Sequence, residues 1–207
     1  MKDPLMVHQK KNSMKILIGC EFSGVVRDSF KAKGHEAWSC DLMETETPGN
    51  HLVGNVLDFL EMGWDLAIFH PPCTYLCSSG LHWNKRKPER QKQTEQALDF
   101  VRRLLDAPID KIALENPIGC ISTRIRKPDQ IIQPFQFGHP ESKSTCLWLK
   151  NLPLLKPTNV LSIPECGYWD NQTPSRQNKL GPSKDRWKER SVTYQGIAKA
   201  FADQWNE

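Results

Sequence analysis

The sequence predicts an α/β fold in which helices cover both faces of a mainly parallel sheet. Short apolar runs of strand length alternate along the chain with segments whose apolar residues have helical spacing. The length of 207 residues suits one domain, and the 38% hydrophobic content is ordinary for a globular chain. Such a chain can bury enough apolar surface to fold without disulfides or metals.

The first half of the chain supplies three of the predicted strands. Residues 15–19 (KILIG) form an apolar run that ends in glycine, and a helical pattern follows from Val25 to a stop at Gly34. Residues 37–40 predict a second strand, closed by Asp41. Residues 65–69 (DLAIF) predict a third, which must end at the prolines after His70 because proline cannot continue a central ladder.

The second half contains the clearest helical pattern, at residues 89–106, with Ala97, Val101, Leu104 and Leu105 on one face. Strands are expected at 111–114 and 145–149, and a closing helix at 196–205. Residues 151–190 are rich in Pro, Asn, Gln and basic residues, and we expect a basic loop region there.

Residues 1–13 are polar and lack the apolar core of a signal peptide, so we expect a flexible start followed by a single domain at 14–207. No apolar run approaches the roughly 20 residues that span a bilayer. A cytoplasmic protein without a membrane partner is expected.

The seven cysteines do not have the spacing of a disulfide framework. His70, Cys73, Cys77 and His82 could in principle bind zinc. However, two prolines follow His70 directly and no CxxC pair supports the set, so no metal is expected.

The net charge is only +4, but basic residues are concentrated in two stretches, 84–92 (NKRKPERQK) and 176–190 (RQNKLGPSKDRWKER). Such stretches suit a polyanion partner, although each alone is more typical of a solvated loop.

Four clusters of polar or reactive residues follow the predicted strands: the loop from Gly19 to Gly24, Asp41, the HPPC segment at 70–73 and the ENP segment at 115–117. In parallel sheets, ligands bind beyond the carboxyl ends of the strands. The sequence therefore predicts a ligand site at this edge.

Cys73 is the candidate nucleophile because two prolines fix the backbone before it and hold the thiol at the sheet edge. Glu115 emerges from an apolar strand, where core packing does not explain it. The two make a nucleophile and a proton-handling acid at neighbouring strand ends. The remaining cysteines in or beside apolar segments are expected to be unreactive core residues: Cys20, Cys40, Cys120 and Cys146.

The order of these clusters resembles that of the DNA (cytosine-5) methyltransferases. ILIGCEFSGVVRDSFKAKGHEAWSCDL resembles the cofactor-binding segment of that family, HPPCTYL its Pro-Pro-Cys loop and ALENP its Glu-Asn motif. TYQGIAKAFADQW resembles the closing motif. The resemblance spans about residues 14–205 and is nearest to a short group found in bacteriophages.

The resemblance implies the Rossmann-like fold of class I S-adenosylmethionine-dependent methyltransferases. It implies that Cys73 adds to carbon 6 of cytosine while Glu115, with Asn116, holds the Watson–Crick edge of the base. S-adenosyl-L-methionine is the implied cofactor. Its implied site residues are Cys20, Phe22, Ser23, Gly24, Asp41, Asn55 and Pro71, with Gly24 allowing close backbone approach and Asp41 accepting hydrogen bonds from the ribose.

For the substrate, the implied contacts are Pro72, Lys85, Arg86, Arg124 and Arg126, the last two on one face of an expected extended segment. The chain has no room for the large target-recognition region of the family. DNA cytosine is the first hypothesis. A free cytosine nucleotide, RNA, and a non-catalytic DNA-binding module are the alternatives.

Two further points stay open on the sequence alone. His139, Glu141 and Lys143 precede the strand at 145–149 and fit either a site or a structural turn. An amino-methyltransferase would want an aromatic residue after Pro-Pro, where this chain has Cys73.

Overall fold

The structure is a computed structural model that describes residues 13–175, 178–181, 183–184 and 186–206. The expected flexible segment therefore lies outside the described residues except for Ser13, as does part of the second basic stretch. The strands are β1 (Lys15–Gly19), β2 (Glu36–Asp41), β3 (His51–Val53), β4 (Leu66–Phe69), β5 (Lys111–Pro117), β6 (Gln130–Ile132) and β7 (Thr145–Lys150). The helices are α1 (Val25–Lys31), α2 (Ser78–Leu81), α3 (Pro88–Leu105), α4 (Ile121–Arg124), α5 (Arg186–Ser191) and α6 (Gln195–Gln204), and the 3₁₀ helices are η1 (Val56–Phe59), η2 (His82–Lys85) and η3 (Pro134–Gln136).

The described strands form one sheet in the order β3-β2-β1-β4-β5-β7-β6. The pairs from β3 to β5 are parallel, whereas β7 runs antiparallel to both β5 and β6. This mainly parallel sheet with one reversed strand confirms the predicted Rossmann-like α/β fold.

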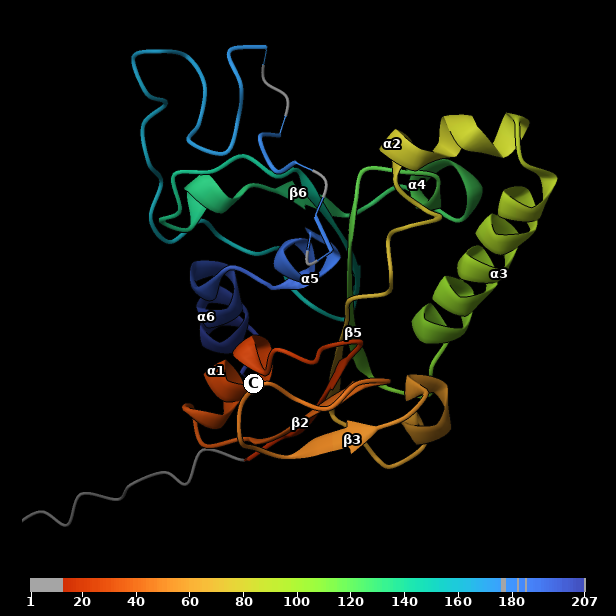
Figure 1. Ribbon diagram of the computed structural model, residues 1–207. Coiled ribbons are helices and arrows are strands. Elements are labelled where there is room, and N and C mark those ends of the chain that lie inside the picture. Colours follow the sequence, from red (N-terminus) through yellow and green to blue (C-terminus); the bar gives the residue numbers. More distant parts are fainter. Residues whose placement is uncertain (1–12, 176–177, 182, 185, 207) are drawn as a thin grey trace, which may run out of the picture.

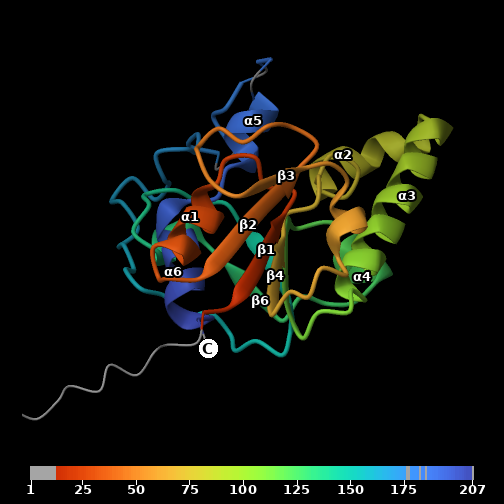
Figure 2. The same ribbon diagram turned by 90° about the horizontal axis from the view of Figure 1, so that it is seen from below.

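Helices cover both faces of the sheet because alternate strand residues point to opposite sides. Ile16 and Ile18 pack in a core with helices α1 and α6, while Leu17 belongs to the core under α3. The two layers are visible on either side of the sheet in Figure 1 and, from below, in Figure 2. Within the described residues, no helix is long and apolar enough to cross a membrane.

Five segments differ from the sequence prediction. The short strands β3 and β6 were not expected, and the region 151–190 contains the helix α5 within its loops. The ENP segment is the last part of β5 rather than a turn after it, because 115–117 pairs with β7. The segment at 123–126 is not extended, since α4 includes Arg124.

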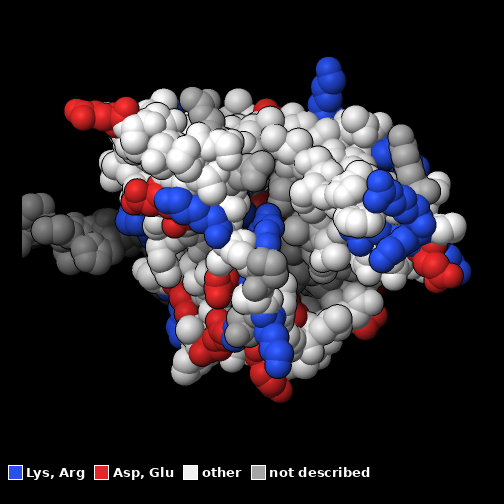
Figure 3. Space-filling view, turned by 45° about the horizontal axis from the view of Figure 1, so that its top comes forward, with Lys and Arg blue, Asp and Glu red and all other residues white. Residues whose placement is uncertain are grey.

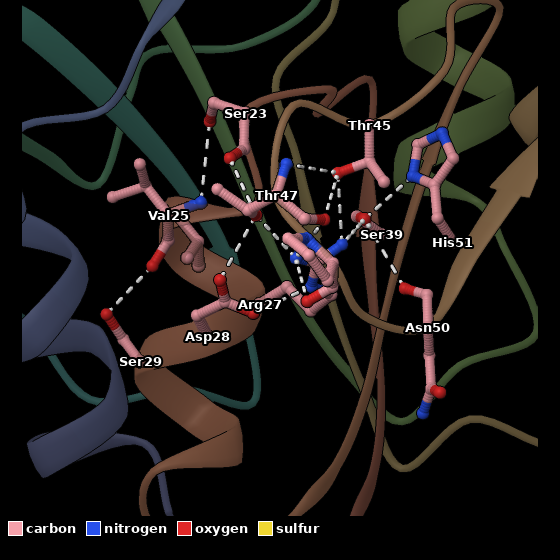
Figure 4. A network of polar contacts seen from close by, with 12 residues as sticks. Ser23, Val25, Arg27, Asp28, Ser29, Ser39, Thr45, Thr47, Asn50 and His51 are labelled. Carbon is pink, nitrogen blue, oxygen red and sulfur yellow. Dashed lines mark hydrogen bonds and ion pairs between the residues drawn. The ribbon is translucent and has the colours of Figure 1, made fainter.

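Arg27 is a residue of α1, and its side chain is fully buried. Hydrogen-bond acceptors enclose its guanidinium (Figure 4). Nε donates to Asp28 Oδ1 at 2.8 Å, and Nη1 donates to Ser39 Oγ at 3.0 Å and Thr45 Oγ1 at 3.1 Å. Nη2 donates to Thr47 Oγ1 at 2.7 Å. A buried charge is tolerated only when it is paired and hydrogen-bonded, so these contacts fix α1 against the segment after β2.

Gly24 and Gly34 together test how closely this network is packed. Both have a left-handed backbone, with φ of 75° and 89°, but only a Cβ at Gly24 would clash, at 2.2 Å from Thr47 Oγ1 and 2.5 Å from Arg27 Nη2. We expect Gly34→Ala to lose about 1 kcal/mol of unfolding free energy from backbone strain. Gly24→Ala should lose about 1–3 kcal/mol more, the usual cost of overpacking. Urea unfolding measures both losses of unfolding free energy. Equal losses in the two variants would show that the side chains around Gly24 move aside without cost.

Candidate active site

Two adjoining cavities lie at the carboxyl ends of the central strands, where the strand order reverses between β1 and β4. Reversals of this kind open a crevice for ligands in α/β sheets. The α3-side cavity has a volume of about 530 Å³ and the α5-side cavity about 600 Å³. Four residues line both cavities: Cys20, Asp41, Leu42 and Pro72.

The α3-side cavity combines a mostly apolar lining with polar groups at its edge. Asp41, the last residue of β2, accepts a hydrogen bond from the Met43 backbone N–H at 3.1 Å. Asn55 caps η1 by accepting from the Leu57 N–H. Helix α3 adds two amides and two apolar groups: Gln93, Gln96, Ala97 and Phe100.

The residues implied to bind the cofactor divide into two groups. Cys20, Asp41 and Asn55 line the α3-side cavity, and Phe22 lines the α5-side cavity. The others do not line either cavity: Ser23, Gly24 and Pro71.

These three residues instead have structural contacts. Ser23 is buried and accepts a hydrogen bond from the Val25 N–H. The space in front of Gly24 is filled by the Arg27 network, so packing explains this glycine. Pro71 is buried, and its carbonyl accepts a 2.7 Å hydrogen bond from Asn116 Nδ2. Asn116 is likewise buried and ties β5 to the Pro-Pro segment from outside the two cavities.

The α5-side cavity contains Cys73 and Cys77 and is bordered by helix α5. Trp187 of α5 packs against Phe22 with ring centroids 5.9 Å apart. Lys188 pairs with Glu46 in the segment after β2. Helix α5 is therefore docked on the loops after both β1 and β2, and Arg186 and Arg190 reach the cavity.

Cys73 and Cys77 are neighbouring thiols whose ionisation is linked, and the Cys77 backbone N–H donates to the Cys73 carbonyl at 3.0 Å. The interaction with the Cys77 thiol and burial raise the pKa of Cys73. The same interaction, the Ser79 hydroxyl at 3.2 Å, the Gly80 N–H and the Arg190 charge together outweigh burial and lower the pKa of Cys77 to about 5. Because Cys77 has these additional donors, thiolate is favoured at Cys77 over Cys73.

Glu115 is paired with His70, which lines the α5-side cavity. Glu115 Oε2 lies 3.0 Å from His70 Nδ1. Burial alone would raise the pKa of the Glu115 carboxyl, but the His70 hydrogen bond and the Lys143 charge outweigh it and hold that pKa below its usual range. Glu115 itself lines neither cavity, but its charge acts on the Cys73 thiol.

Among the residues implied to bind the substrate, only Pro72 lines the cavities. Arg124 donates to both carboxylate oxygens of Glu95 at 2.9 Å, and Arg126 donates to Asp129 at 2.7 Å. Both arginines are thus paired with acids, and the expected extended segment is wrong at Arg124, which belongs to α4.

The first basic stretch adjoins an exposed aromatic residue. Trp83 is 43% exposed, with the Arg86 guanidinium 5.5 Å and the Lys87 amine 5.7 Å from its ring centroid. The side chain of Lys85, also an implied contact, lies outside the described residues. Lys and Arg side chains gather in groups around a hollowed part of the face that Figure 3 shows.

The FGHPESKS segment divides between the two interpretations that the sequence left open. His139 Nε2 accepts from the Gly196 N–H at 2.9 Å, and Glu141 accepts from the Tyr194 hydroxyl, so both fasten this segment to the start of α6. Lys143 instead lines the α5-side cavity and donates to the Arg190 carbonyl at 2.9 Å. Two of the three residues are thus structural, and Lys143 belongs to the site.

Sequence reasoning gave His70, Cys77 and Arg190 no role beside Cys73 and Glu115. His70 carried one usable signal, since it stands between a buried strand and two prolines and is thereby aimed at the sheet edge. For Cys77 and Arg190 the sequence offers no such signal, because their approach depends on how the loop after β4 and helix α5 fold back.

No family model matches the chain, and no curated protein matches it. Among solved structures it is similar to a protein from E. coli described provisionally as a DNA modification methyltransferase encoded within a prophage. The identity is 12% and the TM-score 0.46, over 73% of this chain and 53% of the other. The chain thus spans about half the length of that neighbour. A likeness this distant assigns no function, so any assignment rests on the site.

The thiol pair predicts an unusual alkylation profile. Because the pKa of Cys77 is lowered to about 5, its thiolate is already fully formed at pH 6.5. We expect iodoacetamide to label Cys77 at a rate that is flat from pH 6.5 to 8, with peptide mass spectrometry locating the label. The alkylation rate of glutathione, measured in parallel, should rise with pH throughout this range, as it does for an ordinary thiol. A Cys77 rate that climbs with pH like that of glutathione would contradict the pairing.

Proposed function

We propose that this chain is an S-adenosylmethionine-dependent methyltransferase that modifies carbon 5 of cytosine in DNA, with Cys73 as the nucleophile. The observation that carries the proposal is the pair of cavities meeting at Cys20 and Pro72. One cavity has the lining of a nucleoside site, and the other contains a cysteine beside an acid-bearing strand. A methyl donor and a base bound in adjoining cavities would have their reacting atoms near the junction.

The α3-side cavity fits the adenosine part of the cofactor. Its volume of about 530 Å³ is typical of small-molecule sites, which are mostly apolar with a few placed polar groups. Asp41 would accept hydrogen bonds from the ribose hydroxyls, and Asn55, Gln93 or Gln96 would meet the edge of the adenine. S-adenosylmethionine supplies the methyl group when bound.

The residues of the α5-side cavity would activate the base. As the Cys73 sulfur bonds to carbon 6 of cytosine, its proton would pass to the Cys77 thiolate. The electron pair of the C5–C6 double bond becomes available at carbon 5, which takes the methyl group. Loss of the proton from carbon 5 to solvent water then restores the double bond and expels the Cys73 sulfur, which regains its proton from Cys77. Ionised Glu115 would accept a hydrogen bond from the exocyclic amine and would stabilise a proton taken up from solvent on ring nitrogen 3 of the activated ring.

Cationic groups near the site favour a polymer over a free nucleotide. Arg186 and Arg190 line the α5-side cavity, and Arg86 and Lys87 surround the exposed Trp83. Such groups can contact successive phosphates, and an exposed aromatic ring can stack on a base. A base in a duplex would have to leave the stack to reach Cys73, at a cost of a few kcal/mol.

The cofactor assignment predicts that Asp41→Ala weakens binding of S-adenosylmethionine by about 1–3 kcal/mol, since two hydrogen bonds to a carboxylate are lost. Titration calorimetry measures the difference. Asp99→Ala is the matched control, because Asp99 is an exposed acid of α3 that does not line the cavity. Undiminished binding by Asp41→Ala would remove Asp41 from the cofactor site.

The nucleophile assignment predicts a covalent trap. DNA containing 5-fluorocytosine should form an adduct that survives denaturing electrophoresis and requires S-adenosylmethionine, because fluorine blocks the final elimination. Cys73→Ser should abolish the adduct, since a serine hydroxyl is far less available as an anion. Cys166→Ser, at an exposed cysteine outside the site, should leave it intact. An adduct that persists in Cys73→Ser would show that another group is the nucleophile.

The choice of a polymer predicts a steep salt dependence of DNA binding. Replacing Arg86 and Lys87 by Ser should reduce the slope of log K against log salt by about 2, near 0.9 for each phosphate contact removed. Replacing Arg102 and Arg103, in the last turn of α3, removes the same charge away from Trp83 and should leave the slope unchanged. A parent protein with no salt dependence would instead favour a free cytosine nucleotide. RNA and DNA are compared in the same assay.

A further inference from the structure

His70 is a buried side chain with a single hydrogen bond. Its side chain is 7% exposed, and its Nδ1 lies 3.0 Å from Glu115 Oε2. The other ring nitrogen, Nε2, is buried and has no hydrogen-bond partner among the described residues. Histidines that only fill a core normally have both nitrogens satisfied, because an unpaired buried polar atom is costly. The hydrogen bond to Glu115 is therefore the contact that explains the position of the His70 ring.

The strand register brings His70 and Glu115 together. Phe69 pairs with Leu114 in the parallel ladder of β4 and β5, so the next residues on the two strands are His70 and Glu115. The prolines after His70 restrict its backbone, and the Asn116 amide holds the Pro71 carbonyl from β5. The imidazole is thus held at the carboxylate by two neighbouring strands rather than by a free loop.

We propose that His70 is a positioning residue that orients the Glu115 carboxylate toward the α5-side cavity and keeps it ionised for the substrate base. This inference rests on the proposed function for its purpose, but the His70–Glu115 pair can be tested without substrate.

Other charged groups act on the same pair. Lys143 favours the ionised form of Glu115, and the Glu115 charge in turn disfavours thiolates at Cys73 and Cys146. The charges of Glu21, in the loop after β1, and His70 also interact. His70 differs from Lys143 because it supplies both a charge interaction and a hydrogen bond to Glu115. Without His70, less would offset the effect of burial, so the pKa of the Glu115 carboxyl should rise.

A matched pair of variants separates the two ring nitrogens. The amide nitrogen of His70→Asn can occupy the place of Nδ1 and keep the hydrogen bond to Glu115, whereas that of His70→Gln occupies the place of Nε2. Carbon-detected NMR titration of side-chain carboxyls, with the Glu115 signal assigned by Glu115→Gln, gives the titration midpoint directly. We expect the midpoint to move to higher pH in His70→Gln and to move less in His70→Asn.

Methyl transfer is the second measurement. His70→Gln should lower kcat roughly 10- to 100-fold, the effect of losing a hydrogen bond to a charged group, and His70→Asn should recover part of that loss. The pH dependence of kcat should show an inflection caused by Glu115, and this inflection should shift together with the NMR titration midpoint. A purely structural role for His70 would change the amount of folded enzyme without moving this inflection.

The outcomes distinguish the two proposals. An unchanged Glu115 midpoint in both variants overturns the role of His70, whatever the activity. A shifted midpoint with no methyl transfer by the parent protein sustains the role of His70 and overturns the proposed function. Should neither variant fold, the ¹⁵N shifts of the His70 ring in the parent and in Glu115→Gln decide. A loss of the Nδ1 hydrogen-bond signature in Glu115→Gln supports the pair, and identical shifts overturn it.

Discussion

The guanidinium of Arg27 is buried between helix α1 and the segment that follows β2, and a charge at that depth must be surrounded by acceptors. Two of those acceptors are the threonines Thr45 and Thr47, which lie only a few residues beyond Asp41. Gly24 and Gly49 fit against the guanidinium with no room for a Cβ. The network therefore fixes the path of the chain beyond Asp41, and with it one edge of both cavities. The edge against which a ribose would bind thus depends on a charge that never meets the ligand.

Two prolines with restricted backbones and one side-chain amide form the opposite edge of the site. Pro71 and Pro72 end β4, and the Asn116 side chain holds the Pro71 carbonyl from the neighbouring strand. Because β5 continues through 115–117 against the antiparallel β7, Asn116 has ladder partners on the side away from β4. The reversed strand thereby extends β5 and stiffens the support under Cys73. A short chain can present a fixed nucleophile in this way without an additional domain.

The parts of the fold that local pattern determines were predictable from the sequence, whereas parts that depend on distant partners were not. β1 and β4 are continuous apolar runs, and α3 has an apolar stripe at helical spacing. Their own residues therefore identify them. β3 and β6 have three residues each and exist because they pair with β2 and β7. The same reason applies in the site. Cys73 and Glu115 follow recognisable strands, but the His70 contact follows from register, and the partner of Arg124 is 29 residues away.

The reactive groups of the site occur as two interacting pairs, the thiols Cys73 and Cys77 and the hydrogen-bonded Glu115 and His70, and this arrangement creates an electrostatic problem. A thiolate and a carboxylate close together disfavour each other's charge unless cations lie nearby. Lys143 favours ionised Glu115, and Arg190 favours thiolate at both cysteines. Lys143 also holds the Arg190 carbonyl, so one contact ties the two cations together. Since Arg190 belongs to α5, which is docked on the loop after β1 through the Trp187 ring, the charge state of the thiols is coupled to the loop that borders both cavities. A displacement of α5 would therefore change thiol ionisation as well as access to the site.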